Sequence, residues 1–179
     1  MEDDGPKHFC GVIGMTLEGD AVPYLKKGLR IIQHRGQEAA GIAVSNGKTI
    51  SYHRGMGLVH EVLVGRQYNG LAGNTGIGHV RYSTSGTSCA ENCQPITVTT
   101  KEGDLALAHN GDIVNAASIR NKFQTEGWAF LTSTDSEIIV RMMATELSIN
   151  PDPIRAIKTV MRSLEGAYSI VMMLGGRIF

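Results

Sequence analysis

The sequence shows no excess of charge of one sign, no long apolar run and few aromatic residues. Lysine and arginine together number 17, aspartate and glutamate also number 17, and the formal net charge is zero. Nucleic-acid-binding domains usually carry a basic patch or stripe, so the absence of any basic block argues against a nucleic acid partner. No apolar stretch approaches the length of a membrane span, so we expect no membrane partner either.

Cysteine is also scarce. The three cysteines, Cys10, Cys89 and Cys93, are an odd number without the spacing of a disulfide framework, which favours a reducing compartment and a cytoplasmic protein. Cys89 and Cys93 lie four positions apart, but two sulfur atoms alone do not complete a zinc or cluster site. We therefore interpret these two as free thiols and predict no metal site in this chain.

What the sequence does contain is enough for one folded domain. Its 179 residues are 42% hydrophobic and 19% charged, and its 22 glycines are scattered between periodic segments, as in a protein with many tight turns. The first nine residues, Met1 to Phe9, are acidic and contain no apolar stretch, so they are not a secretory signal.

Hydrophobic periodicity predicts an α+β fold with antiparallel sheets. Strands follow one another as hairpins and helices follow one another as pairs, which disfavours a parallel sheet built from βαβ units. The last predicted strand stops after three residues and would leave its neighbour as an unpaired edge, so we expect the 179 residues to be part of something longer; a natural short edge strand is the alternative. Strands are predicted over 10–15, 39–45, 49–53, 76–82, 96–100, 105–108, 128–131, 167–174 and 177–179, and helices over 23–33, 115–126 and 135–148 and from 153 onward. Asn46-Gly47 is predicted to form the turn between the second and third of these strands, Asn115 to cap the helix that runs to 126, and Asp152-Pro153 to begin the last helix.

Several segments combine glycine with polar groups where a core would contain neither. Alone, a cysteine that opens an apolar strand is more often a buried core thiol, and His109-Asn110-Gly111 would more often be a hairpin turn. Together these segments favour a catalytic site instead. They are Cys10-Gly11, Gln33 to Glu38, His79 to Gly86, His109 to Asp112 and Thr134 to Glu137.

Three of these segments carry a family resemblance. The stretches Gln33 to Gly41 (QHRGQEAAG), Gly78 to Gly86 (GHVRYSTSG) and Ala108 to Gly111 (AHNG) resemble the glutaminase domain of glutamine phosphoribosylpyrophosphate amidotransferases. The related glucosamine-6-phosphate synthases typically have tryptophan where this chain has Tyr82. The resemblance covers the chain from Cys10 to its end.

The resemblance implies an N-terminal-nucleophile hydrolase fold, a four-layer αββα sandwich of two antiparallel sheets. It also implies a leader peptide over residues 1–9 that is removed to expose Cys10, followed by a glutaminase domain over 10–179 that is incomplete at its C-terminus. The chemistry fits this order. Only a thiolate attacks an amide effectively, and an α-amine that titrates near pH ~8 is a suitable base, but only once Cys10 is the first residue.

The resemblance also assigns roles to residues. Cys10 is the nucleophile, while the Asn110 side-chain amide and the Gly111 N–H form the oxyanion hole. Arg81 binds the carboxylate of glutamine and Asp135 its ammonium; a surface ion pair for Arg81 and a helix-start acid for Asp135 are the alternatives. Tyr82 and Arg35 are expected beside the substrate, and His34, His79 and His109 are expected to be structural.

The resemblance further implies what lies outside these residues. Ammonia from glutamine would pass to a phosphoribosyltransferase domain and start purine synthesis, with Mg²⁺ and an iron–sulfur cluster, where present, bound downstream. The full-length protein is expected to form a homo-oligomer. Two alternatives stay open: the same glutaminase serving another acceptor, and a non-catalytic unprocessed fragment that binds a partner.

Overall fold

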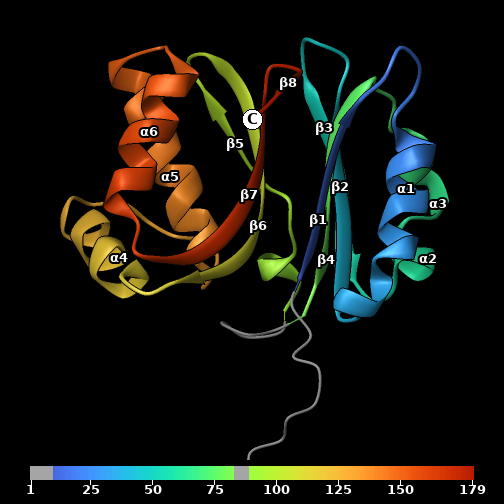
Figure 1. The fold of residues 1–179 in the computed structure, drawn as a ribbon, viewed down its shortest axis with the longest axis horizontal. Helices are drawn as coiled ribbons and strands as arrows, with labels where there is room; N and C mark the ends of the chain where they lie inside the picture. Colours follow the sequence, from blue (N-terminus) through green and yellow to red (C-terminus); the bar gives the residue numbers. More distant parts are fainter. Residues whose placement is uncertain (1–9, 83–88) are drawn as a thin grey trace, which may run out of the picture.

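Two β-sheets face each other, and helices cover both outer faces, in the four layers that Figure 1 shows edge-on. The structure is a computed structural model that describes residues 10–82 and 89–179. The predicted α+β sandwich of two antiparallel sheets is thereby confirmed. The proposed leader, residues 1–9, lies outside the described residues.

The first sheet has four antiparallel strands in the order β1-β4-β2-β3. The predicted Asn46-Gly47 hairpin forms, since Ser45 pairs with Ile50 and Gly47 has a φ of +88°. Gly11 on the first strand pairs with Val80, so Cys10 lies beside the end of the strand that carries Arg81. The strands are β1 (Gly11–Thr16), β2 (Ala39–Ser45), β3 (Ile50–Met56) and β4 (Thr75–Arg81).

The second sheet is also antiparallel, in the order β5-β6-β7-β8. Its strands are β5 (Ile96–Thr100), β6 (Gly103–Ile113), β7 (Gly166–Leu174) and β8 (Arg177–Ile178). β7 pairs with β6 as far as Ile113, whereas β5 pairs with it only as far as Leu107. Among the described strands, the last part of β6 is therefore paired on one side only, by β7.

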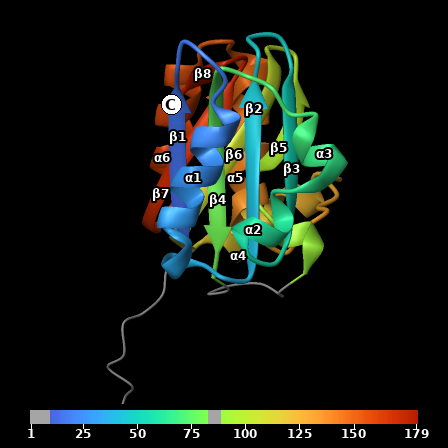
Figure 2. The same ribbon diagram turned by 90° about the vertical axis from the view of Figure 1, so that its right-hand side faces the viewer.

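Helices cover the outer faces of both sheets, and Figure 2 looks onto α1, α2 and α3 over the first sheet. α1 begins with Pro23 in its first turn, a position where the missing N–H of proline costs nothing. α6 is capped by Asp152, whose Oδ1 accepts the Ile154 N–H at 2.9 Å, a contact that typically contributes about 1 kcal/mol. The helices are α1 (Val22–Ile31), α2 (Val59–Val62), α3 (Gly65–Asn69), α4 (Ala116–Thr125), α5 (Asp135–Ile149) and α6 (Pro153–Ser163), with the 3₁₀ turns η1 (Gln33–Arg35) and η2 (Ala90–Asn92).

Three apolar clusters separate the four layers. One packs α1 and α2 against the first sheet, and another packs α5 and α6 against the second. The cluster between the sheets contains Ala43, Ala106 and Ala108 beside Ile77 and Met173. Small side chains at this level let the two sheets approach closely.

Two local predictions are wrong. Residues 128–131 form a loop rather than a strand, because the N–H of Leu131 bonds to the carboxylate of Glu137 and that of Trp128 to Phe123 O instead of a neighbouring strand. Asn115 precedes α4 as predicted but does not cap it, because its amide bonds to Ser163 O and Glu165 N.

Candidate active site

The alternation of side chains along the strands brings four predicted residues into the layer between the sheets. On β4, Ile77 belongs to the inter-sheet cluster, so His79 and Arg81, two and four residues on, face the same way. On β6, Ala106 and Ala108 face this layer, which puts Asn110 on that side. On β1, Val12 packs against the same inter-sheet cluster, and Cys10 lies two residues before it, immediately ahead of the strand.

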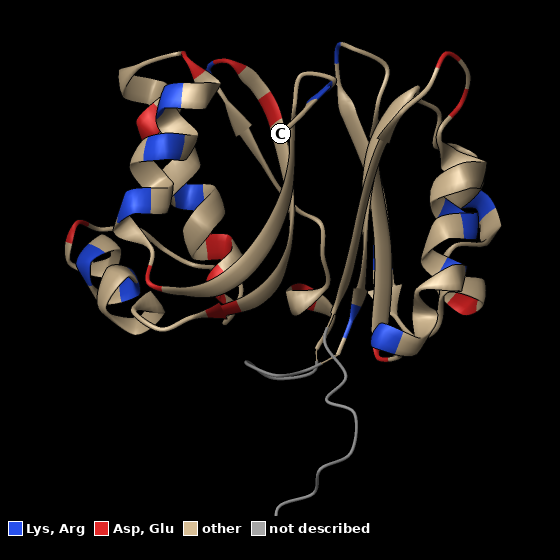
Figure 3. Cartoon of the chain, in the orientation of Figure 1, with Lys and Arg blue, Asp and Glu red and all other residues tan. Residues whose placement is uncertain are grey.

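These residues lie at one end of the sandwich, at the bottom of Figure 1, where β1 begins and β4 and β6 end. α5 also begins there, which brings Asp135 to the same end. Charged residues of both signs are spread over the outer helices and the loops (Figure 3), unlike the basic stripe typical of nucleic-acid-binding domains.

The Cys10 thiol is buried against the backbone of Tyr82. Its Sγ lies 3.3 Å from Tyr82 O and accepts the Tyr82 N–H at 3.4 Å. Burial raises the pKa of the Cys10 thiol, although the Tyr82 hydrogen bond and the positive charge of Arg81 partly offset this effect. A thiol in this environment needs a base before it can attack.

Arg35 and Tyr82 both contact Cys10. Arg35 Nε donates to Cys10 O at 3.3 Å, which ties η1 to the start of β1. Tyr82 is 40% exposed, so its ring is accessible while its backbone holds the thiol. A pocket of about 150 Å³ opens here, lined by His34, Gly36, Gln37, Glu38 and Tyr82.

Arg81 is 3% exposed, so the alternative of a surface ion pair is wrong. A guanidinium this deep in the inter-sheet layer, beside the nucleophile, can present two parallel N–H groups to a carboxylate. The second half of its motif, Ser83 to Gly86, lies outside the described residues.

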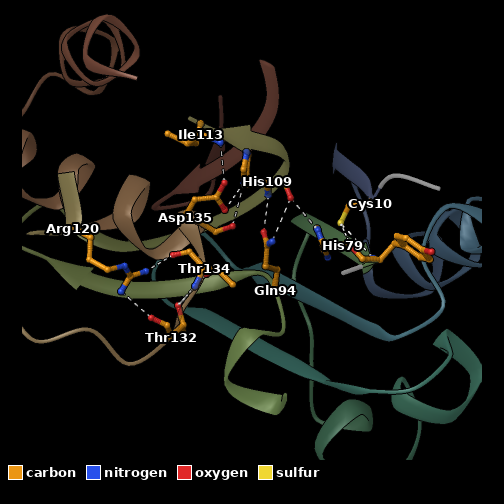
Figure 4. A network of polar contacts seen from close by, with 11 residues as sticks. Cys10, His79, Gln94, His109, Ile113, Arg120, Thr132, Thr134 and Asp135 are labelled. Atoms are coloured by element: carbon orange, nitrogen blue, oxygen red, sulfur yellow. Dashed lines mark hydrogen bonds and ion pairs between the residues drawn. The ribbon is translucent and has the colours of Figure 1, made fainter. Parts of the chain in front are cut away.

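The segment His109-Asn110-Gly111 is part of β6, so the alternative of a hairpin turn is wrong. Gln94 pairs with the His109 backbone: its Oε1 accepts the His109 N–H at 2.7 Å, and its Nε2 donates to His109 O at 3.3 Å. His79 Nε2 donates to the same oxygen at 3.0 Å, which joins the two sheets (Figure 4).

The Gly111 N–H points away from β7. In a strand, residues two apart direct their N–H groups to the same side. The N–H groups of His109 and Ile113 bond to Gln94 and Asp135 on the side of β6 that faces away from β7, so the Gly111 N–H between them points to that side as well. No described strand runs along β6 on that side of Gly111, because β5 reaches only Leu107. This geometry leaves a backbone donor at an open sheet edge beside Asn110.

Asp135 lies at the start of α5, as its helix-start interpretation predicts, and also contacts β6. Its Oδ2 accepts the Ile113 N–H at 3.2 Å, and its Oδ1 lies 3.4 Å from His109 Nδ1. Burial alone raises the pKa of this carboxyl, but the hydrogen bonds from His109, Ile113 and Ser136 outweigh burial and lower it. Asp135 is therefore an anionic group held against β6 at His109 and Ile113, with acceptor capacity left for an ammonium.

A second set of contacts holds the loop before α5 (Figure 4). Arg120 on α4 donates to Thr132 O at 3.0 Å and Thr134 O at 2.7 Å. From the other side, the buried Glu137 carboxylate accepts the N–H groups of Leu131 and Thr132. These contacts fix where α5 begins and hence where Asp135 lies.

Sequence reasoning missed Gln94 and Arg120, and it gave Glu137 no role of its own although it singled out the segment Thr134 to Glu137. Gln94 is a polar residue just before a predicted strand, and nothing local indicates that it pairs with a residue 15 positions away. His79 and His109 were expected to be structural, and their contacts to β6 and Asp135 agree with that expectation.

The described ranges, 10–82 and 89–179, bring together no group of three or more potential metal ligands among His, Cys, Asp and Glu side chains. None of the helices in those ranges combines the length and the apolar character needed to cross a bilayer. All three cysteines are free thiols, as predicted for Cys89 and Cys93.

Comparison with known proteins identifies the family. A family model described as a glutamine amidotransferase domain matches residues 79–176. An amidophosphoribosyltransferase of Methanocaldococcus jannaschii is 45% identical over 92% of this chain and 36% of its own length, and that of Rattus norvegicus is 42% identical over 97% of this chain and 36% of its own. The chain thus spans about a third of the length of these relatives.

Solved structures agree. The glutamine phosphoribosylpyrophosphate amidotransferase from B. subtilis, complexed with ADP and GMP, matches with a TM-score of 0.82 and 35% identity over 92% of this chain and 35% of that one. The predicted resemblance is confirmed by these matches. Because the family model covers more than half of its residues, the chain belongs to the glutamine amidotransferase domain family.

Proposed function

We propose that this chain hydrolyses glutamine to glutamate and ammonia through a thioester on Cys10. The observation that carries the proposal is the open edge of β6. There the Asn110 side chain and the Gly111 N–H lie at the same end of the inter-sheet layer as the Cys10 thiol. A nucleophile beside two hydrogen-bond donors is the arrangement that acyl transfer requires.

The base is the α-amine of Cys10, once residues 1–9 have been removed. The free amine takes the thiol proton, and the Sγ thiolate attacks the side-chain amide carbon of glutamine. The resulting oxyanion accepts hydrogen bonds from Asn110 and Gly111. The carbon–nitrogen bond then breaks, and ammonia leaves with the proton returned by the amine. A water molecule, deprotonated by the same amine, attacks the thioester and releases glutamate and the thiol.

Removal of residues 1–9 is part of the proposal, because an amide nitrogen cannot accept the thiol proton. The raised pKa of the Cys10 thiol supports this view, since the thiol stays protonated without a base. His79 and His109 are held by structural contacts instead: His79 Nε2 bonds to His109 O, and His109 Nδ1 contacts Ser136 and Asp135.

The rest of the substrate would bind to charged groups on either side of the reacting carbon. The Arg81 guanidinium binds the α-carboxylate, and the Asp135 carboxylate binds the α-ammonium. Tyr82 and Arg35 border this site, where Tyr82 lines the pocket and Arg35 holds the Cys10 carbonyl. Loss of either charge would weaken glutamine binding more than it slows the chemical step.

The names of the relatives support a proposal for the fate of the ammonia. We propose that a phosphoribosyltransferase domain receives it in the full-length protein, in purine synthesis, with Mg²⁺ and, where present, an iron–sulfur cluster bound outside these 179 residues. That protein would be a cytoplasmic homo-oligomer. The three free cysteines support a reducing compartment.

The test is ammonia release from glutamine by a chain that begins at Cys10. We expect ammonia and glutamate in equal amounts, none from the Cys10→Ala variant, and undiminished release from Cys89→Ala, a matched thiol control. Residual release by Cys10→Ala would exclude Cys10 as the nucleophile. A folded chain without any release that still binds a partner would favour a non-catalytic role.

A further inference from the structure

The Gln94 side chain makes, at the edge of β6, the backbone hydrogen bonds that a neighbouring strand would otherwise make. β5 pairs with β6 only as far as Leu107, so no strand of the described ranges pairs with the outward N–H and C=O groups of His109. The Gln94 carboxamide bonds to both groups, at 2.7 Å and 3.3 Å, in the donor and acceptor pattern that a neighbouring strand would offer. Gln94 is 5% exposed and His109 2% exposed, so water does not replace these bonds.

Unlike a strand, a single side chain can pair with only one residue of its neighbour. Gln94 satisfies one residue of β6 and extends no further, whereas a longer β5 would also have paired with Gly111 and consumed its N–H. His79 Nε2 adds a second donor to His109 O at 3.0 Å. The peptide group that joins His109 to Asn110 is thereby held by two donors immediately before the proposed oxyanion hole (Figure 4).

The far side of Gly111 is held as well. The Ile113 N–H bonds to Asp135 Oδ2, so the backbone is fixed two residues before and two residues after Gly111. Between these two anchors Gly111 has a φ of +146°, a conformation that side chains rarely adopt. Such a backbone keeps its direction only where its surroundings determine it.

We propose that Gln94 is a positioning residue for the oxyanion hole, which orders β6 at His109 while leaving the Gly111 N–H open to the reacting oxygen. This inference rests on the proposed glutaminase activity. The Gln94 carboxamide bonds to the His109 backbone rather than to the nucleophile or to either oxyanion donor. It acts through the His109–Asn110 peptide, with His79 as the second support.

A purely structural role for Gln94 predicts a different result. Loss of its two buried hydrogen bonds would then lower stability and affect every property of the site alike. A positioning role predicts that only steps that form an oxyanion slow down. Glutamine hydrolysis forms one, whereas alkylation of Cys10 by iodoacetamide displaces iodide from a saturated carbon and forms none.

The experiment compares Gln94→Met and Gln94→Ala in a chain that begins at Cys10. Methionine keeps the side-chain volume and loses both hydrogen bonds, so a cavity cannot explain its effect. Asp152→Ala is the matched stability control, since it removes one hydrogen bond at the start of α6, beyond the far end of α5. The readouts are kcat and KM for glutamine, and the rate of Cys10 alkylation by iodoacetamide.

For both Gln94 variants we expect kcat to fall about 10- to 100-fold, because a displaced oxyanion donor retains only part of its effect. We expect KM and the alkylation rate to change by less than about threefold, because neither glutamine binding nor alkylation forms an oxyanion. Asp152→Ala should leave both rates unchanged.

Three results would overturn the inference. If Gln94→Met keeps the kcat of the parent chain, positioning by Gln94 is wrong while the glutaminase proposal stands. If hydrolysis and alkylation fall in parallel, Gln94 is structural only. If the parent chain alkylates but hydrolyses no glutamine, the proposed function fails, and this inference fails with it.

Discussion

Replacement of Gly111 by alanine should destabilise the fold and disturb the oxyanion hole together. Gly111 has a φ of +146°, and a Cβ added there would lie 2.3 Å from Ala167 O and 2.5 Å from Tyr168 Cα. Both are backbone atoms of β7, which is paired with β6 at this point and cannot move aside as a flexible side chain could. Strained backbone costs about 1–3 kcal/mol, and overpacking adds about 1–3 kcal/mol.

Gly103→Ala separates the two contributions. Gly103 begins the same strand and has a φ of +111°, but nothing lies within 4 Å of an added Cβ. It therefore carries the backbone strain without the clash, and Gly111→Ala should be less stable than Gly103→Ala by about 1–3 kcal/mol. Urea unfolding followed by circular dichroism measures this difference through the transition midpoints. Equal midpoints for the two variants would refute the close packing of β6 against β7 at the site.

Three further changes test separate parts of the site. Asn110→Ala should lower kcat by about 10²- to 10³-fold and leave alkylation of Cys10 by iodoacetamide unchanged; a parallel loss would contradict its role as a donor. Arg81→Lys keeps the charge but loses the planar fork, so KM for glutamine should rise about tenfold, whereas an unchanged KM would exclude carboxylate binding. Burial lowers the pKa of His79 to about 3. As the pH falls, the unfolded chain therefore takes up this proton before the folded chain does, and the free energy of unfolding should fall by about 2 kcal/mol between pH 6.5 and 5. Urea unfolding should show a weaker pH dependence of that free energy in His79→Gln, and an equal pH dependence in both chains would contradict a neutral, buried imidazole.

Local sequence signals were sufficient for most of the fold. The Asn46-Gly47 turn and the Asp152-Pro153 helix start depend on neighbouring residues alone, and both formed as predicted. The short helices α2 and α3 carry too few residues to show a period and were not predicted. The loop at 128–131 has the composition of a strand, but its backbone groups bond to a side chain on α5.

The residues of the candidate site could be proposed from the sequence, but the contacts that support them could not. Glycine and polar residues in five separate segments indicated Cys10, Arg81 and Asn110, because their chemistry is unusual for a core. The role of Gln94 depends on where β5 stops relative to β6, a property of two strands that no local pattern encodes. The His79 contact depends on the approach of the two sheets, which small side chains in the layer between them allow.

The most direct test of Cys10 as a glutamine-specific nucleophile is the intact mass of the protein after exposure to an electrophilic glutamine analogue. We expect a chain that begins at Cys10 to gain one label that maps to Cys10, and a chain that still carries residues 1–9 to gain none. Excess glutamine should protect the first chain. A folded chain that begins at Cys10 and remains unlabelled, or takes its label at Cys89 or Cys93, would contradict the proposed mechanism.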